Sequence, residues 1–477
     1  MKKGSLPVKT AVLSVLSCAV ACAASTATTV YETSSERPFR ELRHVPSFSP
    51  HEMPTVPTLD IDAAKPSHPF LGLGVSFAEA SCRALMELSA AEREKALRMV
   101  FTDEGAGVSM GRIHVGCSDY SDHVYTYDDV MDDDKLEHFS IDPDRKYVLP
   151  VVKEAQKLNP SMFFFGSVWT PPAWMKLGRS LGGGWIDSRK LPVFCDYYVK
   201  FLQAYAQEGV KVSAISAQNE PCSDQQGESP ECKWGPNEER LFAAELMPPR
   251  LKAAGLDTEI WLHDCEPHEW RQVLSLLDEP AVRANAQGVA WHSYGDWPEK
   301  GLGKILAKYP GVRMYHTEQG PHLDRARRPI TWWGEKVTRF LNAGCSSFTS
   351  WCLALDEEGR PNTSRGFNCA GFLEIDSETG KVRPSAQWEL FRHIGPYVKR
   401  GAQVLATDYA AQEVERNAIP MSERFVMAFR NPDGSVVVVA TNKNGGMERK
   451  LALQVKCRGQ YAVFQIPHLS VVTIVLK

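Results

Sequence analysis

The 477-residue sequence lacks the patterns of several common protein classes. It has no long run of basic residues, and its net charge is −4, so both features argue against a nucleic-acid partner. No Cys-x-x-Cys and no Cys/His pair occurs at metal-ligand spacing, which argues against a structural zinc site. Gly72-Leu73-Gly74 lacks the third glycine of the dinucleotide-binding fingerprint. We therefore predict no metal and no cofactor.

Long apolar runs are also absent, because the N-terminal run Ala11–Ala24 is only fourteen residues long and too short to span a membrane. Three lysines precede or begin this run, and small residues follow it, which is typical of a secretory signal peptide over residues 1–24. Its removal would bring the net charge to about −7. We expect an exported protein, secreted or periplasmic. Lipid anchoring at Cys22 is the alternative, since the preceding residues loosely resemble a lipobox without its usual Leu.

Cysteine is present in a number that permits disulfide bonds in an exported chain. Twelve cysteines occur, and ten remain if Cys18 and Cys22 leave with the signal peptide. Cys222 and Cys232 are the best local pair, because a bond between them would close a short loop; Cys352 and Cys369 come next.

The middle of the chain alternates strand-like and helix-like segments. The β-rich runs are Leu71–Ser76, Val108–His114, Met162–Trp169, Val212–Gln218, Glu259–His263, Gly288–His292, Val312–Thr317 and Ser346–Trp351. Amphipathic helices are expected between most of them, such as Ala90–Phe101, Pro192–Glu208, Glu238–Ala254 and Trp333–Ala343. Eight such units predict an α/β fold, a (β/α)8 TIM barrel over residues 66–398. An open doubly wound sheet is the alternative, but the failed glycine fingerprint argues against it.

Both ends of the chain look different from this middle part. Over residues 399–477 the helical period disappears, and short strands separated by turn residues predict a β-sandwich. Residues 25–65 also contain short strand-like pieces, which have no partners of their own. We therefore expect both chain ends to form one all-β side domain.

Two glutamates follow strands at positions where a barrel carries its catalytic groups. Asn219-Glu220-Pro221 follows the fourth predicted strand, and Thr317-Glu318 ends the seventh. The carboxyl ends of all strands meet at one rim of a barrel, so the two side chains should face each other there. Two carboxyls flanking one bond are what glycosidic cleavage needs.

Further motifs extend this pattern along nearly the whole mature chain. They are Gly72–Ala80, Arg112, Asp119-Tyr120, Tyr125–Asp129, Trp169–Lys176, Trp291–Tyr294, Trp351–Asp356, Gly359–Asn362 and Ile466–Thr473. With the two glutamates, they resemble glycoside hydrolase family 30 of clan A, which contains glucosylceramidases and microbial β-1,6-glucanases. The resemblance implies a barrel with a β-sandwich made from both chain ends, in agreement with the pattern of strands and helices.

By this resemblance the chain is a retaining β-glycosidase, with Glu220 as general acid/base and Glu318 as nucleophile. Retention predicts that the two carboxyls lie about 5–5.5 Å apart. Asn219 matches the residue that hydrogen-bonds the sugar 2-hydroxyl. Arg112 is the expected partner of Glu318, because a guanidinium would keep the nucleophile ionised; a purely structural ion pair is the alternative.

The resemblance also assigns residues to the substrate pocket. Asp119, Trp169 and Trp351 match residues that line the subsite of the cleaved sugar, and His292 and Tyr294 match the loop after the sixth strand. There, a tyrosine hydroxyl can steady the nucleophile. A loop-capping role for Asp119 and core packing for Trp351 and His292 remain open.

Three departures from the family pattern put the substrate in doubt rather than the reaction. They are Trp351-Cys352 in place of Trp-Asn, Asp264-Cys265-Glu266 in place of Asp-His-Asn, and Arg112-Ile113-His114 in place of Arg-Val/Ile-Pro. We expect a β-linked glycan or glycoside as substrate, of the glucosylceramidase or endo-β-1,6-glucanase type. β-Xylosidase, β-fucosidase and glucuronoxylanase activities remain open, as does the oligomeric state.

Two other classes of protein are the competing hypotheses. The first is a catalytically silent glycan-binding protein. The second is a metal-dependent barrel hydrolase, for which His114, His263, His292 and His316 are the only candidate ligands at strand ends, without paired spacing.

Overall fold

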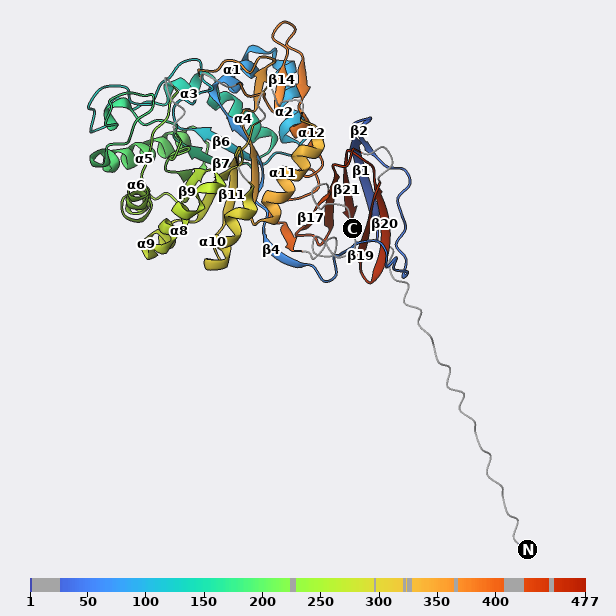
Figure 1. Ribbon diagram of the computed structural model, residues 1–477. Coiled ribbons are helices and arrows are strands. Elements are labelled where there is room, and N and C mark those ends of the chain that lie inside the picture. The colour runs from blue at the N-terminus through green and yellow to red at the C-terminus, as the bar shows by residue number, and fades with distance from the viewer. Residues whose placement is uncertain are drawn as a thin grey trace.

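The computed structural model consists of a helix-surrounded barrel beside a β-sandwich (Figure 1). It describes Met1 and residues 26–223, 229–295, 297–320, 323, 328–363, 368–406, 424–445 and 450–477. Apart from Met1, the predicted signal peptide 1–24 lies outside the described residues, and so do Cys18 and Cys22. Among the helices of the described residues, none has the length and apolar character that a membrane crossing requires.

Eight strands form the parallel barrel that the sequence predicts. In chain order they are β5 (Gly72–Phe77), β6 (Met110–His114), β7 (Phe163–Ser167), β8 (Val212–Ser216), β9 (Glu259–Cys265), β10 (Gly288–His292), β11 (Met314–Glu318) and β12 (Ser347–Ser350). Each strand pairs with the next in sequence from β5 to β11, and β12 pairs with β5. Backbone bonds such as Gln319 N to Thr349 O (3.1 Å) close the barrel between β11 and β12.

Helices cover the outside of the barrel between its strands (Figure 1). They are α1 (Glu79–Glu87), α2 (Ala90–Phe101), α3 (Asp142–Lys146), α4 (Val148–Leu158), α5 (Leu191–Gln207), α6 (Pro236–Leu241), α7 (Met247–Ala253), α8 (Trp270–Asp278), α9 (Pro280–Asn285), α10 (Leu302–Lys308), α11 (Ile330–Asn342) and α12 (Ala386–Arg392). The helix expected over Glu238–Ala254 is instead interrupted by a π-helical turn, Phe242–Leu246. Pro248 and Pro249 follow this turn, and because proline lacks an N–H, regular α-helical bonding cannot continue through them.

The barrel interior is built in layers. Its apolar layer consists of Met110, Phe165, Ala214, Trp261, Ala290 and Tyr315. Side chains alternate along a strand, so residues two positions further on also point inward, at the carboxyl rim. On five strands these residues are polar: Arg112, Ser167, Ser216, His292 and Thr317. The strand pattern thus places the apolar layer beneath a polar layer at the carboxyl ends of the strands.

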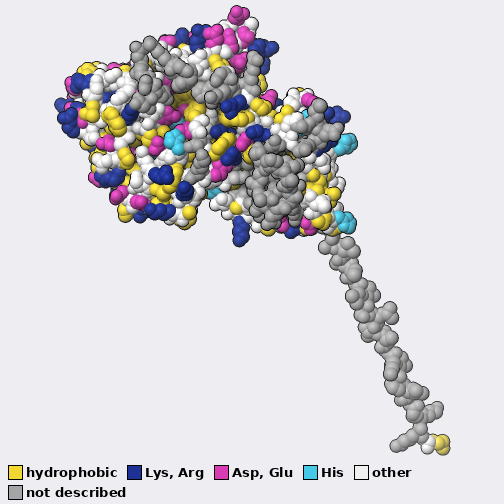
Figure 2. Space-filling view, in the orientation of Figure 1, with side chains coloured by type: hydrophobic (Ala, Val, Ile, Leu, Met, Phe, Trp, Pro, Cys, Tyr) yellow, Lys and Arg dark blue, Asp and Glu magenta, His cyan; other side chains and the backbone are white. Residues whose placement is uncertain are grey.

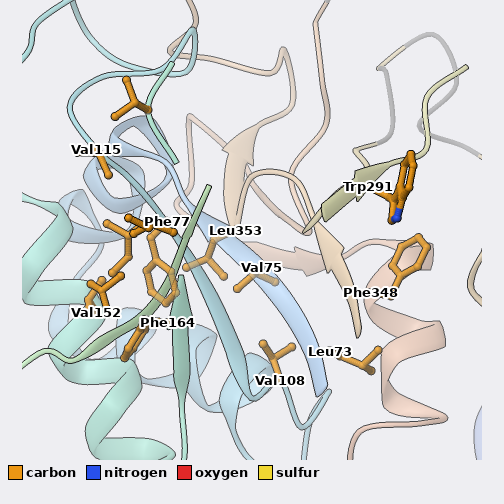
Figure 3. Packing of buried hydrophobic residues seen from close by; sticks show 14 of the residues in the cluster. Leu73, Val75, Phe77, Val108, Val115, Val152, Phe164, Trp291, Phe348 and Leu353 are labelled. Carbon is orange, nitrogen blue, oxygen red and sulfur yellow. The ribbon is translucent and has the colours of Figure 1, made fainter. Parts of the chain in front are cut away.

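The outward-facing side chains of the same strands form the main core with the helices. Leu73, Val75 and Phe77 alternate along β5, and Figure 3 shows them in one cluster with Phe164 of β7 and Val152 of α4. All five are at most 2% exposed. Burial of each such side chain contributes roughly 1.5–3 kcal/mol, so this layer is a major source of the barrel's stability.

Strands from both chain ends build the side domain, as predicted. One sheet contains β1 (Thr28–Ser34), β2 (Arg37–Glu41), β4 (Lys65–Pro69), β16 (Gln403–Ala406), β17 (Arg424–Arg430), β18 (Val436–Asn442) and β21 (Ser470–Leu476). The second contains β3 (Thr58–Asp60), β19 (Leu451–Cys457) and β20 (Gln460–Ile466). N-terminal β1 pairs antiparallel with C-terminal β21, and β3 pairs with β19.

A separate small sheet follows the last barrel strand, β12. It consists of β13 (Ala354–Asp356), β14 (Leu373–Ile375) and β15 (Val382–Pro384).

The barrel and the sandwich pack closely through α11 and α12. A Cβ on Gly334 of α11 would lie 2.3 Å from Thr441 Oγ1 of β18, so only glycine permits this approach. The His393 ring, just after α12, hydrogen-bonds Thr33 of β1 and Thr473 of β21 at 2.8 and 2.9 Å. These contacts tie both chain ends to the barrel.

Candidate active site

The structure brings Glu220 and Glu318 to the same ring of His292. Glu318 is the last residue of β11, and Glu220 follows β8 by four residues. The Nδ1 atom of His292 lies 3.0 Å from Glu220 Oε1, and its Nε2 atom lies 3.9 Å from Glu318 Oε2. The Glu220 side chain is 15% exposed and that of Glu318 is 7% exposed. Both carboxylates therefore reach the rim, with Glu220 more open to solvent.

Both oxygens of Glu318 are bound by other side chains. The Tyr294 hydroxyl donates to Oε1 at 2.8 Å, and Arg112 Nη1 donates to Oε2. Burial raises the pKa of Glu318 above its usual value, although the positive charges of His292 and Arg112 pull it down. The ion pair expected from the sequence is thus present, but burial raises the pKa of Glu318 by more than the ion pair lowers it.

A buried aspartate that the sequence reasoning did not assign to the site holds the polar rim together. Asp264, at 0% exposure, accepts five hydrogen bonds, and its partners come from five strands. Its partners are Arg112 Nη2 (2.8 Å), Ser167 Oγ (2.6 Å), Ser216 Oγ (2.6 Å), Thr317 Oγ1 (2.6 Å) and His292 Nε2 (3.2 Å). This network links β6, β7, β8, β10 and β11 at one carboxylate of β9.

Charges in this network set the protonation states. Burial alone would raise the pKa of Asp264, but the charge of Arg112 and the bonds from His292 and Ser167 hold it well below the usual range. Burial would lower the pKa of His292; the charge of Glu318 and hydrogen bonds to Asp264 and Glu220 raise it to about 10. His292 is therefore a cation at neutral pH, and it donates from both ring nitrogens.

Local backbone strain helps to position these groups. His263, Asp264 and Glu220 all have positive φ angles, of 76°, 57° and 45°. The extra residue in β9 turns Asp264 toward the barrel interior, where His263 would otherwise point. A bond from Glu220 N to Asp264 O (3.0 Å) then joins the ends of β8 and β9. Such strain is concentrated at functional sites in proteins.

The remaining predicted residues lie around the two glutamates. Asn219 Oδ1 accepts from Arg112 Nη2 at 2.8 Å. The rings of Trp169 and Trp351 stack at 5.3 Å, and the Arg112 guanidinium lies 4.6 Å from the centre of Trp169. Burial, together with the negative charges of Glu318 and Glu220, raises the pKa of Asp119 to about 8. The nine predicted site residues thus form one cluster.

His114 also lies beside these residues, although the sequence indicated it only as a departure from the family pattern and as a possible metal ligand. Its ring lies 4.1 Å from that of Trp169 and 5.0 Å from that of Trp351. Both ring nitrogens are buried without a hydrogen-bond partner among the described residues. Burial lowers the pKa of His114 well below its usual value, so the ring is neutral. His114 lies two residues after Arg112 on β6, so the alternation of side chains along a strand could have placed it on the same face as Arg112.

The disulfide predictions need correction, because all ten cysteines among the described residues are free thiols. Cys222 donates to Gln272 Oε1 (3.3 Å) on α8, whereas buried Cys232 faces the backbone oxygen of Lys233 (3.8 Å). The two thiols therefore have different surroundings, although only nine residues separate them. Cys352 and Cys369 are likewise unpaired with each other.

The histidines do not provide a metal centre of the kind that the competing hypothesis requires. Within the described ranges, one group of potential ligands has its atoms within 4.8 Å of one another, and it consists of Glu220, Glu266 and His292. Both nitrogens of His292 already contact carboxylates, Nδ1 that of Glu220 and Nε2 that of Asp264, and both oxygens of Glu266 bind backbone N–H groups. This donor set does not fit a metal-dependent hydrolase.

The outer surface agrees with the near balance of charge in the sequence. On the face shown in Figure 2, basic and acidic side chains are interspersed. Residues 224–228, 321–322, 324–327 and 364–367, which come after β8, β11 and β13 in the sequence, lie outside the described residues.

Both domains of the fold match a known protein family. The model of the glycosyl hydrolase family 30 TIM-barrel domain matches residues 70–379, and that of the family's beta sandwich domain matches residues 421–474. An endo-1,6-beta-D-glucanase of Neurospora crassa is 28% identical over 389 residues, covering 78% of each chain. The lysosomal acid glucosylceramidase of Mus musculus is 28% identical over 398 residues, covering 78% of this chain and 75% of its own.

Solved structures agree with these relatives. The endo-beta1,6-glucanase BT3312 superposes with a TM-score of 0.82 at 26% identity, over 94% of this chain and 98% of its own. SrfJ from Salmonella typhimurium gives a TM-score of 0.84 at 22% identity and shows the same fold. The predicted fold class is confirmed, and the chain belongs to glycosyl hydrolase family 30.

Proposed function

We propose that this chain is a retaining β-glycoside hydrolase that cleaves β-glucosidic bonds, with Glu318 as nucleophile and Glu220 as general acid/base. The observation that carries the proposal is the pair of carboxylates at the two nitrogens of one His292 ring, at 3.0 and 3.9 Å. One is held on both oxygens, as a nucleophile must be, and the other is more open to solvent.

In the first step, Glu318 attacks the anomeric carbon and Glu220 protonates the departing glycosidic oxygen. Tyr294 and Arg112 keep the attacking carboxylate oriented, and burial makes it a stronger nucleophile than a solvated one. Because Asn219 Oδ1 already accepts from Arg112, its amide N–H group is the part that can donate to a sugar hydroxyl. Hydrogen bonds to the 2-hydroxyl strengthen in the transition state and supply several kcal/mol.

In the second step, water attacks the glycosyl ester, and Glu220 takes up the proton. The switch from acid to base has an electrostatic cause. Free Glu318 is negatively charged and disfavours ionisation of Glu220, whereas the ester formed by Glu318 is neutral. Formation of the ester removes this repulsion, so that Glu220 stays ionised after the first step and can act as a base when water arrives.

The substrate that we propose contains a β-linked glucosyl unit, in a glucosylceramide-like glycoside or a β-1,6-glucan. Both kinds of relative, an endo-1,6-beta-glucanase and a glucosylceramidase, support this choice at equal identity. The Trp169 and Trp351 rings, which pack on each other and on the His114 ring, provide aromatic faces of the kind that suits the C–H face of a sugar ring.

The proposal is tested with purified protein on aryl β-glucoside, β-xyloside and β-fucoside, and on pustulan, laminarin and xylan. We expect hydrolysis of the β-glucoside or of pustulan, with the β-anomer appearing first by NMR. Initial release of the α-anomer would contradict retention, and cleavage of xylan or of the xyloside or fucoside alone would contradict the glucosyl specificity. Binding of a glycan with no hydrolysis would identify a catalytically silent protein.

A further inference from the structure

Glu266 binds the backbone of the loop that carries Tyr294. Glu266 directly follows β9 and is 9% exposed. Its Oε1 accepts from Tyr294 N at 2.8 Å, and its Oε2 accepts from Gly295 N at 2.9 Å. One carboxylate thus satisfies two consecutive backbone N–H groups, with one oxygen on each. Hydrogen bonds to a charged acceptor are roughly twice as strong as neutral ones.

A lysine also binds the backbone of the same loop. Lys336 of α11 donates from Nζ to Ser293 O at 2.7 Å, and it is buried. The loop therefore presents a carbonyl to a cation and two N–H groups to an anion. Ser293 is also fixed through its side chain, since its Oγ donates to Gln319 Oε1 at 2.6 Å. Three anchors over three residues leave the loop little freedom.

This loop matters because it places one hydroxyl group on the nucleophile. The Tyr294 hydroxyl donates to Glu318 Oε1 at 2.8 Å and accepts from Gly320 N at 3.2 Å. A shift of the Tyr294 backbone would move the hydroxyl away from Glu318, since the hydroxyl lies at the far end of a rigid ring. The Glu266 carboxylate is the group that accepts from the Tyr294 N–H itself.

We propose that Glu266 is a positioning residue, whose carboxylate fixes the Tyr294–Gly295 backbone and thereby keeps the Tyr294 hydroxyl on the nucleophile. The inference rests on the proposed function, with Glu318 as nucleophile. A glutamine cannot replace Glu266, because its amide group would turn a second donor against one of the two N–H groups. The glutamate at this position, which departs from the family pattern, thus has a defined structural task.

The main alternative is a direct effect of Glu266 on the acid/base. Its carboxylate oxygen belongs to the group whose ligand atoms, with those of Glu220 and His292, lie within 4.8 Å of one another. An effect through Glu220 would not depend on the Tyr294 hydroxyl, whereas an effect through the loop would. A double-mutant cycle between Glu266 and Tyr294 separates the two.

The test compares Glu266→Gln, Tyr294→Phe and the double variant by kcat and KM on dinitrophenyl β-glucoside. We expect each single variant to lose about tenfold in kcat, and the double variant to lose little more than Tyr294→Phe alone. Losses that multiply to about a hundredfold, or a Glu266→Gln variant with wild-type kcat, would overturn the inference. Glu266→Asp keeps the charge but has a shorter side chain, so we expect a smaller loss of kcat. This variant replaces Glu266→Gln in the test if Glu266→Gln does not fold.

Glu32→Gln is the matched control, because Glu32 is also buried (4% exposed) but pairs with Arg40 in the side domain. It should retain the wild-type kcat. Glu318→Ala distinguishes failure of this inference from failure of the proposed function. If Glu318→Ala is inactive and Glu266→Gln matches the wild type, the nucleophile assignment stands and only the role of Glu266 is wrong. If Glu318→Ala retains activity, the proposed function itself fails.

Discussion

Two fully buried aspartates, Asp264 and Asp144, show how one barrel treats the same carboxyl group in opposite ways. Asp264 at the rim is bound by two cations, Arg112 and His292, and its pKa lies well below the usual range. Asp144 of α3 accepts hydrogen bonds from three tyrosine hydroxyls. Burial raises the pKa of Asp144 to about 6, although these hydroxyls lower it.

The difference teaches that hydrogen bonds from neutral donors do not by themselves hold the pKa of a buried carboxyl at its usual value here. Tyr125, Tyr127 and Tyr205 are neutral donors, and they offset burial only in part. At the rim, full positive charges exceed the cost of burial. The cations that fix Asp264 are the same groups that contact the two candidate catalytic glutamates, so the rim uses one set of charges for structure and chemistry.

The largest effect that this comparison predicts comes from Asp264→Asn. Removing the charge leaves Arg112 and His292 buried with less compensation, and an amide cannot accept from all five donors. We expect kcat to fall by about 100-fold or more, and the free energy of unfolding to fall by about 3–5 kcal/mol. Urea unfolding and steady-state kinetics measure the two effects. A variant with near-normal kcat would show that the network is not needed to align the glutamates.

A smaller effect, and one that changes with pH, is expected for Asp144→Asn. The folded-state pKa of Asp144 is raised from 3.8 to about 6, so its stabilising contribution is complete below pH 3.8 and is lost as the pH rises through 6. The wild type should lose on the order of 3 kcal/mol over this range, whereas Asn cannot ionise. The free energy of unfolding of the variant, relative to that of the wild type, should therefore rise between pH 4 and pH 7, as measured by urea unfolding. The kcat of the variant should stay unchanged.

A difference in stability that stays constant with pH would contradict the assigned state of Asp144. Asp264 provides the contrast in the same experiment. Its pKa is lowered, so its contribution is present above pH 3.8 and is lost only as the pH falls below that value. The stability difference between wild type and Asp264→Asn should thus be level from pH 5 to pH 6, below the range in which the loss of Asp264 also changes the titration of His292.

The smallest predicted effect comes from Tyr125→Phe, which removes one of the three donors to Asp144, the one at 3.2 Å. The loss of one hydrogen bond to this carboxyl should lower the free energy of unfolding by about 1 kcal/mol. It should also raise the pKa of Asp144 further, which moves the pH-dependent loss of stability to higher pH. Thermal unfolding at pH 5 and pH 7 measures both. A loss of kcat would instead couple this cluster to the active site.

The barrel and its two glutamates could be predicted because their signals are local in sequence. Each strand is a short apolar run, and Asn219-Glu220-Pro221 and Thr317-Glu318 stand directly at strand ends. The role of Asp264 could not be predicted in the same way. Its five partners come from five strands, and an extra residue in β9 decides that Asp264 rather than His263 points inward.

Other differences also have non-local or stereochemical causes. The helix period over Glu238–Ala254 gives no sign of the π-helical turn that precedes Pro248 and Pro249. The spacing of Cys222 and Cys232 is suitable for a loop-closing bond, but the fold directs Cys222 toward α8. Spacing in sequence limits which thiols can meet, and only tertiary packing decides which ones do.

The central claim is that Glu318 attacks the sugar and Glu220 transfers the proton, and azide tests it most directly. Glu220→Ala should form the glycosyl ester from dinitrophenyl β-glucoside and then stall, because water lacks its base. Added azide should attack the ester and yield the β-glycosyl azide. With Glu318→Ala, azide can replace only the nucleophile and should yield the α-azide by a single inversion. The β-azide from Glu318→Ala together with the α-azide from Glu220→Ala would reverse the two assignments, and full activity of both variants would contradict the account as a whole.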